Sequence, residues 1–177
     1  MRQLLLLRHA KSSHDDPRFS DHERPLNERG RRAALAMRAA MRDLGLAPDI
    51  VLVSTARRTL ETLEALEPWD ETPLVEPMDQ LYLAESPQLL QALREVPETA
   101  RSVMLVGHNP GMHDLALHLA GDEATKPIRP HARRLSEGFP AGSLVEFSVA
   151  GRWNDIGRGT ARLIRFLCPK DLPEMAA

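Results

Sequence analysis

The 177-residue sequence has little of several features that mark whole classes of protein. It holds one cysteine, Cys168, so an internal disulfide is excluded and a reducing compartment is expected. No stretch approaches the roughly 20 consecutive apolar residues of a membrane-spanning helix. The first apolar run ends at Arg8, before it reaches the length of a signal-peptide core. We therefore expect a cytoplasmic protein that does not bind membranes.

An excess of charge of one sign is also missing, since the formal net charge is -2. Nucleic-acid-binding domains usually carry a basic excess, so we expect no nucleic-acid partner. No phosphate loop of the G-x-x-x-x-G-K type occurs, which argues against an ATP-hydrolysing enzyme. His108 and His113 are five residues apart, not the four that place two metal ligands on one helix face. We predict no metal and no cofactor.

Short apolar runs that stop abruptly at polar residues are the most informative feature of the chain. Leu4–Leu7 reads as a strand buried on both faces, and Arg8 and His9 follow it directly. Two further runs end in the same way: Asp49–Val53 leads into Ser54-Thr55-Ala56-Arg57-Arg58, and Ser102–Val106 leads into Gly107-His108-Asn109-Pro110. The carboxyl ends of parallel strands meet at one edge of a sheet, where ligands usually bind. The runs therefore predict one site containing two imidazoles and two guanidiniums.

The segments between these runs have helical periodicity or strand-like alternation. Helices are expected over residues 29–44, 56–66, 87–96 and 111–119, a short strand at 74–75, and an antiparallel pair of strands at 143–149 and 160–167. Residues 122–142 contain three prolines and no periodicity, so we expect an excursion loop, and residues 170–177 are expected to form a frayed tail. This order predicts a single α/β domain over 1–177, with helices on both faces of a mostly parallel sheet of five or six strands.

The residue types at the predicted edge suit an anionic, phosphoryl-type ligand. Arginine gives bidentate, charge-assisted hydrogen bonds and stays charged at physiological pH, so Arg8 and Arg58 are the candidate phosphate ligands. Neutral imidazole can attack phosphorus and form a phosphohistidine that water later hydrolyses. We expect His9 to be this nucleophile and His108, in its charged form, to stabilise the transferring group.

The same residues resemble the motifs of a known family. Leu7-Arg8-His9-Ala10 is similar to the arginine–histidine–glycine signature of the histidine phosphatase superfamily, with alanine in place of glycine. The segment from Ser54 to Thr62 resembles the second motif, serine-proline-x-x-arginine-alanine-x-glutamine-threonine, which places the phosphate-binding arginine at Arg58 rather than Arg57. Gly107-His108-Asn109 resembles the third motif. Thr55, Thr59 and Glu61 depart from the second motif.

The short length and the segment from Asp21 through Arg24-Pro25-Leu26 to Gly30 resemble the SixA-like branch, the phosphohistidine phosphatases. The resemblance implies a three-layer αβα sandwich, the phosphoglycerate mutase-like fold, without the inserted helical subdomain that carries the leaving-group acid in larger members. It also implies a covalent phosphohistidine and no metal. Asp21 and Glu85 are the candidate acids here, and Arg24, Ser12 and Asn109 are further candidates for the pocket.

The residues predict a metal-independent phosphatase. The resemblance to the SixA-like branch implies that its substrate is phosphohistidine on a protein partner and that it has a signalling role. One alternative is a phosphatase of small phosphate esters. Another is a phosphate-binding regulatory module without turnover, which the lack of an evident acid leaves open.

Overall fold

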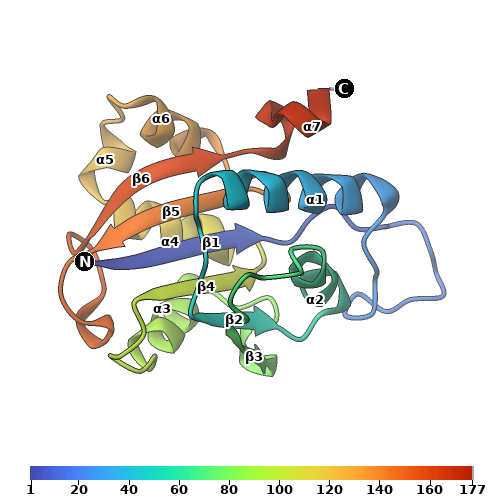
Figure 1. Ribbon diagram of the computed structural model, residues 1–177, viewed down its shortest axis with the longest axis horizontal. Helices are drawn as coiled ribbons and strands as arrows, with labels where there is room; N and C mark the ends of the chain where they lie inside the picture. The colour runs from blue at the N-terminus through green and yellow to red at the C-terminus, as the bar shows by residue number, and fades with distance from the viewer. Residues whose placement is uncertain (177) are drawn as a thin grey trace.

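The computed structural model describes residues 1–176, which build helices around one six-stranded sheet (Figure 1). The strand order is β3-β2-β4-β1-β5-β6. Strands β1 to β4 run parallel to their neighbours, while β5 is antiparallel to both β1 and β6. The strand bounds are β1 Arg2–Arg8, β2 Ile50–Ser54, β3 Leu74–Met78, β4 Ser102–Gly107, β5 Leu144–Val149 and β6 Ala161–Leu167.

The central strands are buried on both faces, and alternate residues enter two separate cores. Leu4 and Leu6 of β1 pack with helices α3 (Ser86–Arg94), α4 (Gly111–Ala120) and α6 (Pro130–Glu137). Leu5 and Leu7 pack on the opposite face with α1 (Glu28–Asp43) and α2 (Arg57–Glu64). Each fully buried leucine contributes about 1.5–3 kcal/mol to stability. The chain is thus an α/β protein with three αβα layers, as expected.

Helix α1 begins and ends at residues that suit those positions. The Asn27 side chain accepts a hydrogen bond from the backbone N–H of Gly30 at 2.8 Å and so caps the helix. Ala33, Met37 and Met41 lie on its buried face. Gly45, at φ 67°, follows the helix in the left-handed conformation that favours glycine.

Parallel pairing aligns the ends of β2, β4 and β1 at one edge of the sheet. Arg8 pairs with Gly107 in the register of β1 and β4, and Val53 pairs with Val106 in that of β2 and β4. Because β4 lies between the other two strands, the residue that follows it is flanked on both sides. The predicted convergence of the three strand ends is therefore present in the fold.

Two expectations for the secondary structure are wrong. Residues 122–142 are not a bare loop, since they contain α5 (Asp122–Thr125) and α6. Pro130 begins α6, and Ala132 and Leu135, three positions apart, bury its one apolar face. Strand β3 is also longer than the expected residues 74–75. It is an exposed edge strand, so its residues lack the apolar pattern that would reveal its full length in the sequence.

The tail after Pro169 is also ordered rather than frayed. A 3₁₀ turn, η3 (Pro169–Asp171), leads into a short helix, α7 (Pro173–Ala176). Leu172 is buried in the same core as α1, and Met175 packs against that core, so two apolar residues fix the segment. Ala177 lies outside the described residues. Within the described chain, no helix is long and apolar enough to cross a membrane.

Candidate active site

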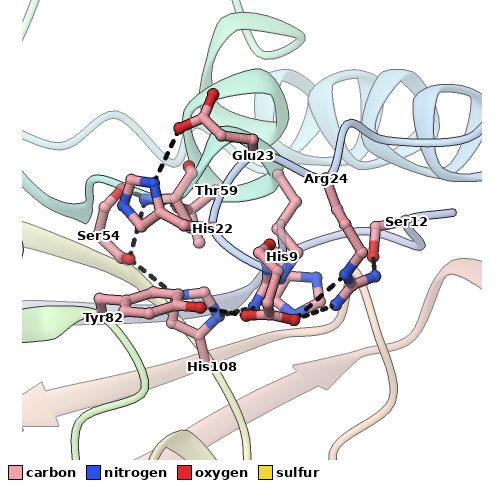
Figure 2. A network of polar contacts seen from close by, with 12 residues as sticks. His9, Ser12, His22, Glu23, Arg24, Ser54, Thr59, Tyr82 and His108 are labelled. Atoms are coloured by element: carbon pink, nitrogen blue, oxygen red, sulfur yellow. Dashed lines mark hydrogen bonds and ion pairs between the residues drawn. The ribbon is translucent and has the colours of Figure 1, made fainter. Parts of the chain in front are cut away.

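Two imidazoles and a guanidinium that are distant in sequence lie together at this edge of the sheet. Figure 2 shows the two imidazoles, those of His9 and His108. His9 follows β1, and its backbone N–H donates to the carbonyl oxygen of Gly107 at the end of β4. The ring centroids of His9 and His108 are 5.2 Å apart. Arg58 reaches the pair from the first turn of α2, with its Nη2 3.4 Å from Nδ1 of His108.

His9 is held as a neutral base with a defined tautomer. Its Nδ1 lies 2.8 Å from the carbonyl oxygen of Ala10, and because a carbonyl only accepts, Nδ1 carries the proton. Nε2 then bears the lone pair. Burial, followed by the charges of Arg58, Arg8 and Arg24, lowers the pKa of His9 to about 4, although the bond to Ala10 opposes the shift. Its Nε2 is therefore unprotonated near neutral pH.

His108 has the opposite tautomer, again fixed by its neighbours. The arginine group can only donate, so Nδ1 of His108 accepts from Arg58, and Nε2–H donates to Oγ of Ser54 at 2.7 Å. Burial is the first cause that lowers the pKa of His108 to about 3, followed by the charges of His9 and Arg58. The second imidazole is thus neutral in this structure, which holds no phosphoryl group.

The two candidate phosphate-binding arginines are held by backbone carbonyls. Arg58, only 2% exposed, donates through Nη1 to the carbonyl oxygen of Asp21 at 2.6 Å. Arg8 donates through Nη1 to the carbonyl oxygen of Phe139 at 3.0 Å. The Nε–H groups of both arginines are buried without an acceptor among the described residues. Burial also lowers the pKa of Arg8. Each side chain therefore has one N–H donor that no described group accepts.

A carboxylate lies directly against this cluster. Oδ2 of Asp21 accepts from Nη2 of Arg58 at 3.1 Å and from the hydroxyl of Tyr82. Oδ1 accepts from Nε and Nη2 of Arg24 at 3.2 and 3.0 Å. The Tyr82 hydrogen bond, together with Arg24 and Arg58, holds the pKa of Asp21 well below its usual range. Asp21 is therefore an anion and not a proton donor in this structure.

Comparison with known proteins shows which family shares this arrangement. The family model of the histidine phosphatase superfamily (branch 1) matches residues 4–81. An uncharacterised protein of Mycobacterium tuberculosis is 34% identical over 167 residues, which cover 93% of this chain and 100% of the relative. A structure classed as a phosphohistidine phosphatase SixA from Nakamurella multipartitia is 31% identical, with a TM-score of 0.82, and covers 95% of this chain and 96% of that one. The chain belongs to the histidine phosphatase superfamily.

A second structure of the same class, from Agrobacterium tumefaciens, is 30% identical with a TM-score of 0.80 and covers 95% of this chain and 98% of that one. Both neighbours support the SixA-like branch of the superfamily, which confirms the resemblance seen in the motifs. Membership of the superfamily supports phosphatase activity.

The family motif assigned the inward arginine to Arg58 rather than Arg57, and the structure separates the two in the same way. Arg57 is exposed and pairs with Glu61, Nε to Oε2, at 3.3 Å. Two departures from the superfamily motif also have local partners. Glu61 accepts from the backbone N–H of Leu26 at 2.8 Å, and the Thr59 hydroxyl lies 2.7 Å from the carbonyl oxygen of Ser54.

The remaining candidates differ in the contacts that they make. Ser12 is buried, and its hydroxyl accepts from Nη1 of Arg24. Asn109 donates to the Phe139 carbonyl oxygen at 2.9 Å, the same oxygen that Arg8 contacts. Glu85 is exposed at the start of α3, where its backbone N–H donates to the side chain of Gln88 at 2.9 Å. Among the described residues, Glu85 forms no hydrogen bond with either imidazole.

Two contacts of the site were missed from the sequence. Tyr82, the one tyrosine of the chain, lies edge-on to His108 with ring centroids 5.5 Å apart. Ser54, which the sequence marks only as a motif position, fixes the tautomer of His108. The superfamily motif could have indicated Ser54, whereas nothing near Tyr82 in the sequence marks it. Within residues 1–176, no group of three metal-ligating side chains is found.

Proposed function

We propose that this chain removes phosphate from phosphohistidine on a protein, without a metal ion, through a covalent intermediate on His9. The observation that carries the proposal is the tautomer of His9. Its proton is on Nδ1, bound to the Ala10 carbonyl, so Nε2 presents a lone pair beside Arg58 and His108. This is the state that nucleophilic attack on phosphorus requires.

In the first step, Nε2 of His9 attacks phosphorus in line and a new P–N bond forms. The P–N bond of the substrate breaks, and its electron pair leaves with the substrate imidazole, which is protonated on its other nitrogen. In the second step, water attacks the phosphorus, the bond to Nε2 breaks, and inorganic phosphate leaves. His9 returns to its neutral form with Nδ1 still bound to Ala10. Division into two displacements lowers each barrier.

The arginines would supply the charge that the phosphoryl group needs in the transition state. Arg8 ends β1 and Arg58 lies in the first turn of α2, and each holds a buried Nε–H without an acceptor among the described residues. Preorganised cationic donors at a desolvated site are the strongest electrostatic aid to such a transfer. Arg24, which binds the Asp21 carboxylate, is the third guanidinium at this edge.

His108 would assist only after it gains a proton. Its Nδ1 accepts from Arg58 and its pKa is lowered to about 3. A dianionic phosphoryl group at this position raises the pKa of an imidazole, because the opposite charge favours the protonated form. The charged imidazole can then donate through Nδ1 to a phosphoryl oxygen while Nε2 stays bound to Ser54.

We propose that no strong general acid is needed for this substrate, since a phosphohistidine is already a good leaving group. Glu85→Gln and Asp21→Asn variants, assayed on a phosphoramidate and on an alkyl phosphate, test this point. Activity of Glu85→Gln on the phosphoramidate should be unchanged. If either variant loses most of that activity, an acid is required and this part of the mechanism is wrong.

A phosphatase of small phosphate esters is the alternative enzyme, because the same donors fit any phosphoryl group. The decisive comparison is turnover of a phosphohistidine protein and of simple phosphate esters, with a chelator present throughout. His9→Ala and His14→Ala serve as a matched pair, since His14 is an exposed histidine of the neighbouring loop. We expect faster turnover of the phosphohistidine protein and its loss only in His9→Ala. A preference for esters would overturn the substrate assignment.

A cytoplasmic signalling role follows only if that substrate assignment holds. Binding of phosphate without turnover of either substrate would instead favour a regulatory module.

A further inference from the structure

The carboxylate of Asp21 is bound much as a phosphoryl group would be. Each of its oxygens accepts two hydrogen bonds: Oδ1 from Nε and Nη2 of Arg24, and Oδ2 from Nη2 of Arg58 and the hydroxyl of Tyr82. Figure 2 shows two of these side chains, Arg24 and Tyr82, near His9 and His108. Two guanidiniums on one small anion are a typical means of binding an oxyanion.

We infer that the Asp21 carboxylate competes with the phosphoryl group for these donors, and that Tyr82 is itself a phosphoryl ligand. The inference rests on the proposed function, which assigns the same guanidiniums to the substrate. A carboxylate and a phosphoryl dianion repel each other and cannot share the donors. When the phosphoryl group binds, the hydroxyl of Tyr82 is therefore transferred from Oδ2 of Asp21 to a phosphoryl oxygen.

The position of Tyr82 supports a role beyond holding Asp21. Its ring is perpendicular to that of His108, at 87°, and the Arg58 guanidinium lies 5.9 Å from its centroid. On its other side the ring packs edge-on against His22, with centroids 4.8 Å apart. Burial and the neighbouring carboxylate raise the pKa of Tyr82. The hydroxyl thus stays protonated, and it is held where it can donate to an anion between Arg58 and His108.

Asp21 can give up the donors without disruption of the loop that carries it. Its side chain is 49% exposed, so a change of rotamer takes the carboxylate into solvent. The backbone carbonyl of Asp21 remains bound to Nη1 of Arg58 at 2.6 Å and also accepts from the backbone N–H of Arg24. The loop is therefore held by its backbone, and the carboxylate is the part that moves.

A double-mutant cycle on tungstate affinity, measured by calorimetry, tests both claims. Tungstate is a tetrahedral dianion and binding requires no turnover. Asp21→Ala should bind tungstate about tenfold more tightly, as expected if the carboxylate occupies the donors in about nine molecules of ten. Asp16→Ala is the matched control. It removes one carboxylate from the same loop, where Asp16 pairs with Arg18, and should change affinity little.

The effect of Tyr82→Phe should depend on Asp21. With Asp21 present, Tyr82→Phe removes a hydrogen bond to an anion from both the free and the bound state, so the affinity for tungstate should change little. In Asp21→Ala, the same change removes such a hydrogen bond from the bound state alone. The affinity should then fall about tenfold or more, as expected for a hydrogen bond to a charged group. If Tyr82 only held Asp21, Tyr82→Phe would tighten binding in the wild-type background and have no effect in Asp21→Ala.

The outcomes separate this inference from the proposed function. If Asp21→Ala binds tungstate more weakly than the wild type, or equally well, the carboxylate does not compete for the donors. If Tyr82→Phe does not change the tungstate affinity of Asp21→Ala, Tyr82 is not a phosphoryl ligand. Asp21→Asn replaces Asp21→Ala in the cycle if the alanine variant does not fold. If the protein turns over phosphohistidine but the tungstate affinities do not follow the predicted pattern, only this inference is wrong. If the affinities follow the pattern but phosphohistidine is not turned over, only the proposed enzymatic function is wrong.

Discussion

Nη2 of Arg58 lies 3.4 Å from Nδ1 of His108, and this contact determines where His108 carries its proton. Because a guanidinium cannot accept, the imidazole must, and its proton resides on Nε2 against Ser54. The neighbouring His9 carries its proton on Nδ1 instead. Both histidines are thus neutral, but the lone pair lies on Nε2 in His9 and on Nδ1 in His108. His9 can therefore act as a nucleophile, whereas His108 can accept a proton.

Oxyanion binding should be accompanied by proton uptake at His108. The pKa of this residue is lowered to about 3, so it is neutral near pH 7, and a bound dianion raises that pKa. Calorimetric titration with tungstate in buffers of different ionisation enthalpy should show uptake of about one proton per site. His108→Gln should abolish the uptake. Binding without uptake by the wild-type protein would show that His108 stays neutral in the complex.

The buried neutral histidines should make stability depend on pH in a defined range. The pKa of His9 falls from 6.5 in the unfolded chain to about 4, so the unfolded state binds more protons between these values. The free energy of unfolding therefore decreases as pH falls from about 6.5 to 4, by up to about 3 kcal/mol from this residue.

Denaturant unfolding of variants at several pH values measures this effect. His9→Gln should flatten the dependence of the free energy of unfolding on pH, whereas His14→Gln, at an exposed position, should leave that dependence unchanged. Equal slopes for both variants would contradict the neutral, buried state of His9.

Gly30 should be required because α1 approaches the chain just after His9. A Cβ at this position would lie 2.0 Å from the carbonyl oxygen of Lys11. Gly30→Ala should reduce the free energy of unfolding by about 1–3 kcal/mol. Turnover should also fall, because the shifted segment carries Ser12, the partner of Arg24. Gly138→Ala is the control, since no heavy atom beyond its own chain neighbours lies within 4 Å of its Cβ position. Equal stability of the two variants would contradict the close approach.

The site could be predicted as far as it depends on strand ends. Leu4–Leu7 and Ser102–Val106 are apolar runs that end in polar residues, and a parallel sheet places such ends at one edge. Tyr82 follows the exposed edge strand β3, which has no such pattern, and it reaches the site through contacts with His22 and His108. These contacts depend on how loops meet in three dimensions, which local periodicity does not encode.

The role of Asp21 was open for a related reason. From the sequence it was a candidate acid, because an isolated aspartate in a loop can be either a proton donor or an ion-pair partner. Its three partners lie 3, 37 and 61 residues away along the chain. Only their assembly around one carboxylate shows that it is held as an anion.

Covalent labelling of His9 tests the central claim most directly. The protein is mixed with a phosphoramidate whose phosphorus is radioactive, quenched at alkaline pH, and digested to locate the label. We predict an acid-labile, alkali-stable phosphoryl group on His9 that is absent from His9→Ala and present in His14→Ala. Label that persists in His9→Ala, or substrate turnover without any protein-bound phosphoryl group in the wild type, would contradict the account.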